Sequence, residues 1–139
     1  MGLDSAFFKQ TIIHPYDWDD TECSVDIMVD GKKIDIDPKR LASVRETVVT
    51  MRHCWMIHDW LEKNLDIEIN GDIYIHVDDL KALKQDLWTV LDDHSKAAEL
   101  LPDEEYDESY FEWLQDIYDE FDKLDLTWKP FVSYVYSEW

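Results

Sequence analysis

The chain has 139 residues, the size of one ordinary domain, and its 45 % hydrophobic and 14 % aromatic content argues against intrinsic disorder. Its 33 Asp and Glu outnumber its 13 Lys and Arg, for a net charge of −20. Such a charge argues against direct binding of nucleic acid or anionic membranes, and favours basic protein partners or cations. Two widely spaced cysteines, no secretion signal and no membrane-length apolar run predict a soluble intracellular protein.

The N-terminal part predicts strands. Residues 6–13 are aromatic and β-branched, as expected for a strand, and residues 14–22 form an acidic loop that contains Asp17, Asp19 and Asp20. Residues 23–29 alternate as a second strand. Asp30-Gly31 is a strong signal for a two-residue hairpin turn, and residues 33–36 supply the returning strand.

A long central helix is predicted for residues 37–64. Asp37 is a suitable N-cap and Pro38 suits the first helical position. Apolar residues then recur at alternating steps of three and four, which is the spacing of one helix face: Leu41, Val44, Val48, Met51, Trp55 and His58. A second apolar stripe suggests that this helix is covered on two sides.

The C-terminal half predicts a second hairpin, two more helices and a last strand. Asn70-Gly71 would join strands at 67–69 and 72–77, and Asp78 would cap a helix over 79–94. An irregular turn at 95–102 precedes a helix over 107–124, and residues 128–139 are aromatic and β-rich. We therefore expect one α+β domain spanning residues 1–139, with antiparallel strands packed on about three helices.

The most unusual feature is a row of carboxylates at four-residue steps, which we call the acidic ladder: Glu104, Glu108, Glu112, Asp116 and Glu120. On a continuous helix they would line one face at steps of about 6 Å. Like charges at this spacing destabilise a helix, so an uncompensated row suggests that a partner needs it. The alternative is a solvated face that only keeps the protein soluble.

If the ladder is functional, it would imitate a nucleic-acid backbone and occupy a basic cleft on another protein. Asp17, Asp19 and Asp20 would extend this partner-binding surface. The expected partner is a basic host protein that acts on nucleic acid, such as a restriction or CRISPR effector. The aromatic C-terminal strand, if it has a free edge, would also allow a homodimer.

A small-ligand pocket is the competing hypothesis, with Arg52, His58, Trp60 and Tyr110 as its candidate residues. No catalytic constellation, phosphate-binding loop or cofactor motif is marked out by local sequence. For a metal, His53 and His58 are five apart and point in different directions on a helix. His58 and Glu62 could share a ligand pair without an apparent third ligand, so the sequence predicts no metal site.

Five segments resemble, in the same order, a family of small uncharacterised phage-encoded proteins that begin MGLDMYL. They are MGLD at the start, RHCWMIHDWLEKN at 52–64, AAELLP at 97–102, EYDESYFEWL at 105–114 and the terminal YSEW. Arg52, Ile57, His58 and Trp60 match the family's R-K-x-N-x-I-H-x-W helix. The family's usual Gly- and Phe-rich insert is missing after Pro102. The resemblance implies a phage protein in the cytoplasm of an infected cell, and implies no catalytic residues.

Overall fold

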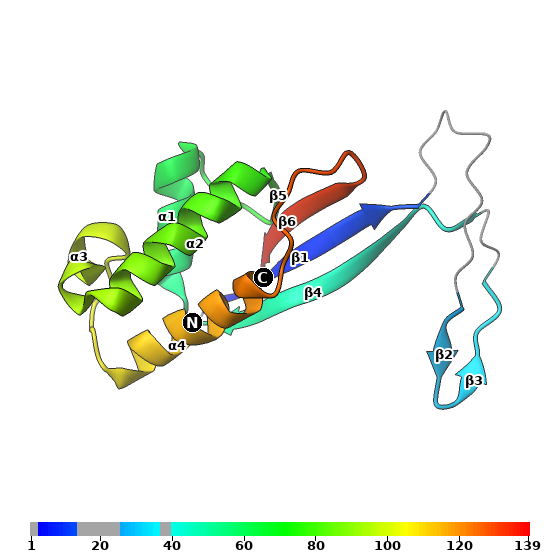
Figure 1. Ribbon diagram of the computed structural model, residues 1–139, viewed down its shortest axis with the longest axis horizontal. Helices are drawn as coiled ribbons and strands as arrows, with labels where there is room; N and C mark the ends of the chain where they lie inside the picture. Colours follow the sequence, from blue (N-terminus) through cyan, green and yellow to red (C-terminus); the bar gives the residue numbers. More distant parts are fainter. Residues whose placement is uncertain (1–2, 14–25, 37–39) are drawn as a thin grey trace.

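The computed structural model describes residues 3–13, 26–36 and 40–139 (Figure 1). Its centre is an antiparallel sheet in the order β4–β1–β6–β5. The strands are β1 (Asp4–Ile12), β4 (Ser43–Arg52), β5 (Asp72–Ile75) and β6 (Val132–Glu138). The first and last strands predicted from the sequence are therefore confirmed, and they lie side by side at the middle of the sheet.

Four helices follow or precede these strands: α1 (Trp55–Leu65), α2 (Val77–Asp92), the single turn α3 (Ala97–Leu100) and α4 (Glu108–Asp122). A short 3₁₀ turn at His94–Lys96 joins α2 to α3. The buried faces of the three longer helices share one core with Phe7, Met51, Tyr134 and Tyr136 of the sheet. The mixed α+β class is confirmed.

The predicted long central helix is wrong over most of its length. Residues Ser43–Arg52 form β4, the edge strand beside β1, and only Trp55–Leu65 are helical. Half of β4 is valine or threonine, whose branched side chains favour a strand. His53 separates strand from helix, because its φ of 57° turns the backbone into the left-handed region. The expected cap at 37–38 lies outside the described residues.

The Asp30-Gly31 hairpin is confirmed, between β2 (Met28–Val29) and β3 (Lys32–Lys33). Both turn residues have positive φ, at 50° and 75°, as a type I′ turn requires. The strands are shorter than predicted, and residues 14–25 of the expected acidic loop and strand lie outside the described residues. The second predicted hairpin is wrong: β5 pairs with β6, and residues 67–69 form no strand.

Two details of the C-terminal half also differ from expectation. Helix α2 begins at Val77 and its N-cap is His76, whose Nδ1 accepts a hydrogen bond from the backbone N–H of Asp78 at 3.1 Å. Asp78 is therefore inside the first turn and does not cap the helix. The C-terminal strand β6 lies between β1 and β5, so the free edge expected there is absent.

Candidate functional site

Three residues of the acidic ladder, Glu108, Glu112 and Asp116, are exposed on the solvent face of α4. With 3.6 residues per turn, their Cα atoms follow one side of the helix at steps of about 6 Å. Within the described residues, none of these three carboxylates forms an ion pair. The described part of the chain therefore supplies no ion pair to compensate the negative charge of this face.

The two ends of the ladder differ from its middle. Glu104 lies before α4 begins and is exposed, so the ladder is not one continuous helical row. Glu120 is half-buried, and its Oε1 lies 2.9 Å from the Nζ of Lys123. The uncompensated row is thus shorter than the sequence predicted. Asp17, Asp19 and Asp20 lie outside the described residues.

Helix α4 holds the ladder rigidly because its opposite face is buried. Tyr110, Leu114, Ile117 and Phe121 are all at most 2 % exposed. Asp107 caps the helix, since its Oδ1 accepts a hydrogen bond from the backbone N–H of Tyr110 at 3.0 Å. Packing and capping therefore fix the ladder's orientation, despite the repulsion among its charges.

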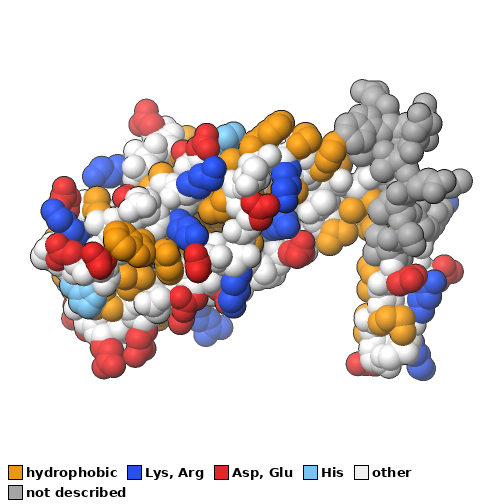
Figure 2. All heavy atoms as spheres, in the orientation of Figure 1, with side chains coloured by type: hydrophobic (Ala, Val, Ile, Leu, Met, Phe, Trp, Pro, Cys, Tyr) orange, Lys and Arg blue, Asp and Glu red, His pale blue; other side chains and the backbone are white. Residues whose placement is uncertain are grey.

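A groove of about 700 Å³ lies beside the start of α4, and we call it the acidic groove. Its lining carries five carboxylates and two tryptophans and includes no Lys or Arg: His53, Trp55, Asp59, Pro102, Asp103, Glu104, Glu105, Asp107 and Trp113. Figure 2 shows Asp and Glu side chains gathered at the end of the molecule where α3 and the first turns of α4 lie. Asp107, which lines the groove, is followed directly in the chain by Glu108, the first ladder residue on α4.

The electrostatics of the acidic groove appear in the pKa of Asp59. Partial desolvation raises the pKa of this carboxyl above its usual value although the residue is exposed, and the carboxylates of Glu62 and Asp103 raise it further. His58 opposes these effects. Desolvation and neighbouring negative charge thus both favour the neutral acid, so a cation entering the groove would find a favourable potential.

The four candidate pocket residues make contacts with four different sets of partners. Arg52 is exposed, with its Nε 3.6 Å from Asp4. Trp60 donates its indole N–H to Asp86 of α2 at 2.8 Å, and the hydroxyl of Tyr110 donates to the carbonyl of Leu101 at 2.7 Å. His58 lies between two carboxylates, those of Glu62 and Glu138. These contacts place Trp60 and Tyr110 in the packing of the helices.

His58 is buried at the junction of α1 and β6. Its Nε2 lies 3.0 Å from Oε1 of Glu62, and its Nδ1 lies 2.9 Å from Oε2 of Glu138. The hydroxyl of Tyr136 is 3.4 Å from the same Nδ1. The contact between His58 and Glu62 could be predicted from their i, i+4 spacing on a helix. The contact with Glu138 could not, because Glu138 lies on β6, far away in the sequence.

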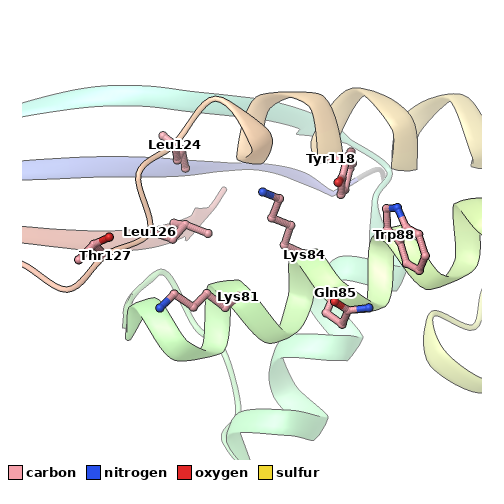
Figure 3. A pocket seen from close by; sticks show the side chains of 8 residues that line it. All are labelled: Lys81, Lys84, Gln85, Trp88, Tyr118, Leu124, Leu126 and Thr127. Atoms are coloured by element: carbon pink, nitrogen blue, oxygen red, sulfur yellow. The ribbon is translucent and has the colours of Figure 1, made fainter.

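A second hollow, of about 570 Å³, lies between α2, α4 and the segment before β6 (Figure 3). Lys84 points into it, with its Nζ 2.9 Å from Asp122 and 5.6 Å from the centre of the Tyr118 ring. Trp88 forms part of the wall and is 46 % exposed. Lys81 also lines the hollow and forms no ion pair within the described ranges.

Comparisons with known proteins add no family to these observations. A scan against family models and searches of curated proteins and of solved structures found no match to this chain. The resemblance to the phage family stays a prediction. Among the helices that the structure describes, none is both long and apolar enough to cross a lipid bilayer.

Proposed function

We propose that this protein binds a basic protein through the acidic ladder and the acidic groove. The observation that carries the proposal is the adjacency of the two: Asp107 lines a groove whose lining has no Lys or Arg, and the exposed carboxylates of α4 begin at the next residue, Glu108. The finer proposal is that the partner is a nucleic-acid-acting host enzyme, which the protein inhibits by occupying its basic channel. The resemblance to phage proteins supports that context.

Electrostatics would supply rate and specificity in this mechanism. A surface of one sign steers a partner of opposite sign and speeds association, and the effect weakens as salt is added. On α4, Glu112 has a like charge four residues away on either side, and each such pair destabilises a helix by about 0.2–0.5 kcal/mol. A row of partner Lys or Arg side chains would relieve that repulsion.

The acidic groove would add recognition of arginine. Trp55 is 44 % exposed and Trp113 is half-buried, so both rings have surface available beside the carboxylates of the groove. A guanidinium group stacks on an indole ring and donates in a fork to carboxylates, whereas an ammonium group does neither as well. An arginine-rich basic segment is therefore the partner chemistry that fits best.

The test is capture of partners from a bacterial lysate on immobilised protein, at about 0.1 M and about 1 M salt, where screening lengths differ about threefold. We expect a nucleic-acid-binding protein that is retained at low salt, released at high salt and displaced by duplex DNA. The combined variant Glu108→Lys, Glu112→Lys and Asp116→Lys should lose it. Retention of the same protein by this variant would contradict the proposal.

A matched control changes net charge equally at three exposed carboxylates away from α4: Asp35→Lys, Glu46→Lys and Glu68→Lys. This variant should keep the partner if the ladder is the binding surface. Equal loss in both variants would show that overall charge alone governs capture, which is the alternative in which acidity serves only solubility. Circular dichroism checks that each variant is folded.

The hollow between α2 and α4 favours a second candidate function, the binding of a small anionic ligand. Its volume lies in the range of about 300–1,000 Å³ typical of ligand sites. Lys81 offers a cation that forms no ion pair within the described residues, and Trp88 and Tyr118 offer aromatic surface (Figure 3). A ring that carries a carboxylate or phosphate would suit it. Thermal-shift screening of aromatic carboxylates tests this, with Lys81→Ala expected to abolish any stabilisation.

A further inference from the structure

Three neighbouring side chains of α1, His58, Asp59 and Glu62, each place one metal-ligating atom within 4.8 Å of the other two. His58 supplies a ring nitrogen, and the other two supply carboxylate oxygens. The sequence offered His58 and Glu62 as a pair without a third ligand; on α1 the carboxylate of Asp59, the residue after His58, lies within reach of both. A mixed set of one nitrogen and two oxygens suits divalent transition metals, zinc among them.

The second observation comes from outside this set. Glu138, on β6, holds the Nδ1 of His58 at 2.9 Å, and the side chain of His58 is only 9 % exposed. A neutral imidazole has one N–H and cannot donate to two carboxylates. In metal sites the ligating histidine donates its other N–H to a carboxylate behind it, which fixes the ring and the tautomer. Glu138 occupies that position, which leaves Nε2 for a cation.

The charge around His58 also needs a cation. Three carboxylates, those of Asp59, Glu62 and Glu138, surround one imidazole. In the described part of the chain, no Lys or Arg forms an ion pair with any of them. Glu62 and Glu138 are partly buried whereas Asp59 is exposed, so two of these charges are largely removed from water, and a protonated imidazole would compensate only one of the two. A divalent cation would compensate two while leaving the imidazole neutral.

We propose that His58 Nε2, Glu62 and Asp59 bind one divalent transition-metal ion, with Glu138 as the group that orients His58. Glu62 and the His58 nitrogen are already 3.0 Å apart, close to the separation of two ligands on one metal. Asp59 is exposed, so the remaining coordination positions face water. The site shares Asp59 with the acidic groove, whereas His58 and Glu62 lie outside the groove's lining.

Isothermal titration of metal-stripped protein with Zn²⁺ tests the proposal, and Co²⁺ absorption reports the coordination. We expect one saturable site per chain. Glu62→Gln and Asp59→Asn should each weaken Zn²⁺ binding at least tenfold, and Glu138→Gln should weaken it by about 10–100-fold, the usual effect of removing an orienting partner. Glu62 lies outside the lining of the acidic groove, so its variant separates this site from binding within the groove.

The control is Glu108→Gln with Asp116→Asn, two exposed carboxylates that take no part in this cluster. It should bind Zn²⁺ as the unmodified protein does. Weak binding at many equivalent sites, or equal affinity in the Glu62→Gln, Asp59→Asn and control variants, would overturn the proposal. Thermal melts without metal establish that each variant is folded. The ring of His58 is buried and contributes to packing, so the test relies on the carboxylate variants and not on His58→Ala.

Discussion

The hydroxyl of Tyr110 donates a hydrogen bond of 2.7 Å to the backbone carbonyl of Leu101, and both residues are completely buried. This bond ties the first turns of α4 to the end of α3. The segment between them, residues 102–107, supplies five of the residues that line the acidic groove. The Tyr110 hydroxyl therefore helps to hold both ends of the segment that forms one wall of the groove.

Tyr110→Phe should destabilise the protein, because it keeps the packed ring and leaves the Leu101 carbonyl without its partner. An unsatisfied buried acceptor costs about 1–3 kcal/mol in the free energy of unfolding, measured by denaturant titration. Tyr106→Phe is the matched control, since the Tyr106 hydroxyl accepts only an exposed hydrogen bond from the Asp103 N–H. An equal effect of both changes would contradict the role assigned to Tyr110.

Asp107 has two roles that substitution can separate. It caps α4 and it lines the acidic groove. Asp107→Ala should lower the free energy of unfolding by about 0.5–2 kcal/mol, whereas Asp107→Asn should change it little, because Asn caps a helix as well as Asp does. Both changes should weaken partner capture alike, since both remove the charge. If Asp107→Asn binds the partner as the unmodified protein does, the charge of Asp107 in the groove does not contribute to partner binding.

The elements that could be predicted from the sequence are those whose spacing of apolar residues is visible within one continuous segment. Helix α4 has a buried stripe at helical spacing, and the first and last strands of the chain, β1 and β6, are rich in aromatic and β-branched residues. Strand β4 misleads because it contains a bulge: Phe7 pairs with Val49 and Phe8 with Thr47, so Val48 is an extra residue. The insertion spaces Val44, Val48 and Met51 by four and three, as in a helix.

The turns could also be predicted from adjacent residues, whereas the pairing of the strands could not. Gly71 has a φ of 90°, as expected for the Asn70-Gly71 turn, yet β5 pairs with β6, about sixty residues later in the chain. The candidate site divides in the same way. The ladder's spacing follows from α4 alone, whereas the groove needs the start of α1 to meet residues 102–113. The spacing of residues in the sequence does not predict this contact between α1 and residues 102–113.

Stability should fall at alkaline pH because Cys54 is buried as a thiol. Burial, with a smaller effect of Asp103, raises its pKa from the ordinary 9.0 to about 12. The stabilisation is therefore fully present below pH 9 and is lost as the pH rises from 9 to about 12, since the unfolded chain ionises first. Between pH 8 and 10 the loss should be on the order of 1 kcal/mol.

Denaturant unfolding of the unmodified protein and of Cys54→Ala at pH 8 and pH 10, under reducing conditions, measures this loss. The variant should show the smaller difference between the two pH values, whatever its stability at pH 8. Tyr136, whose pKa burial raises to about 12 from an ordinary 10.0, contributes mainly above pH 10. Identical pH dependence in the two proteins would rule out Cys54 as the source.

Glu112→Gln should stabilise the protein. Glu112 has Glu108 and Asp116 four residues away on the same face, so the change removes two repulsive pairs, worth together about 0.4–1 kcal/mol in low salt. The gain should shrink as salt rises, because these charges are exposed and screened. Thermal melts at about 0.01 M and about 1 M salt measure both quantities.

Glu68→Gln is the control for that gain, because Glu68 is exposed and lies outside any helix. A stabilisation specific to Glu112 would mean that the spacing of the ladder carboxylates lowers the stability of α4. Such a cost is expected of a binding surface and not of a solubilising one. Equal stabilisation by both changes would assign the effect to net charge. In that case the ladder would need no partner to explain it.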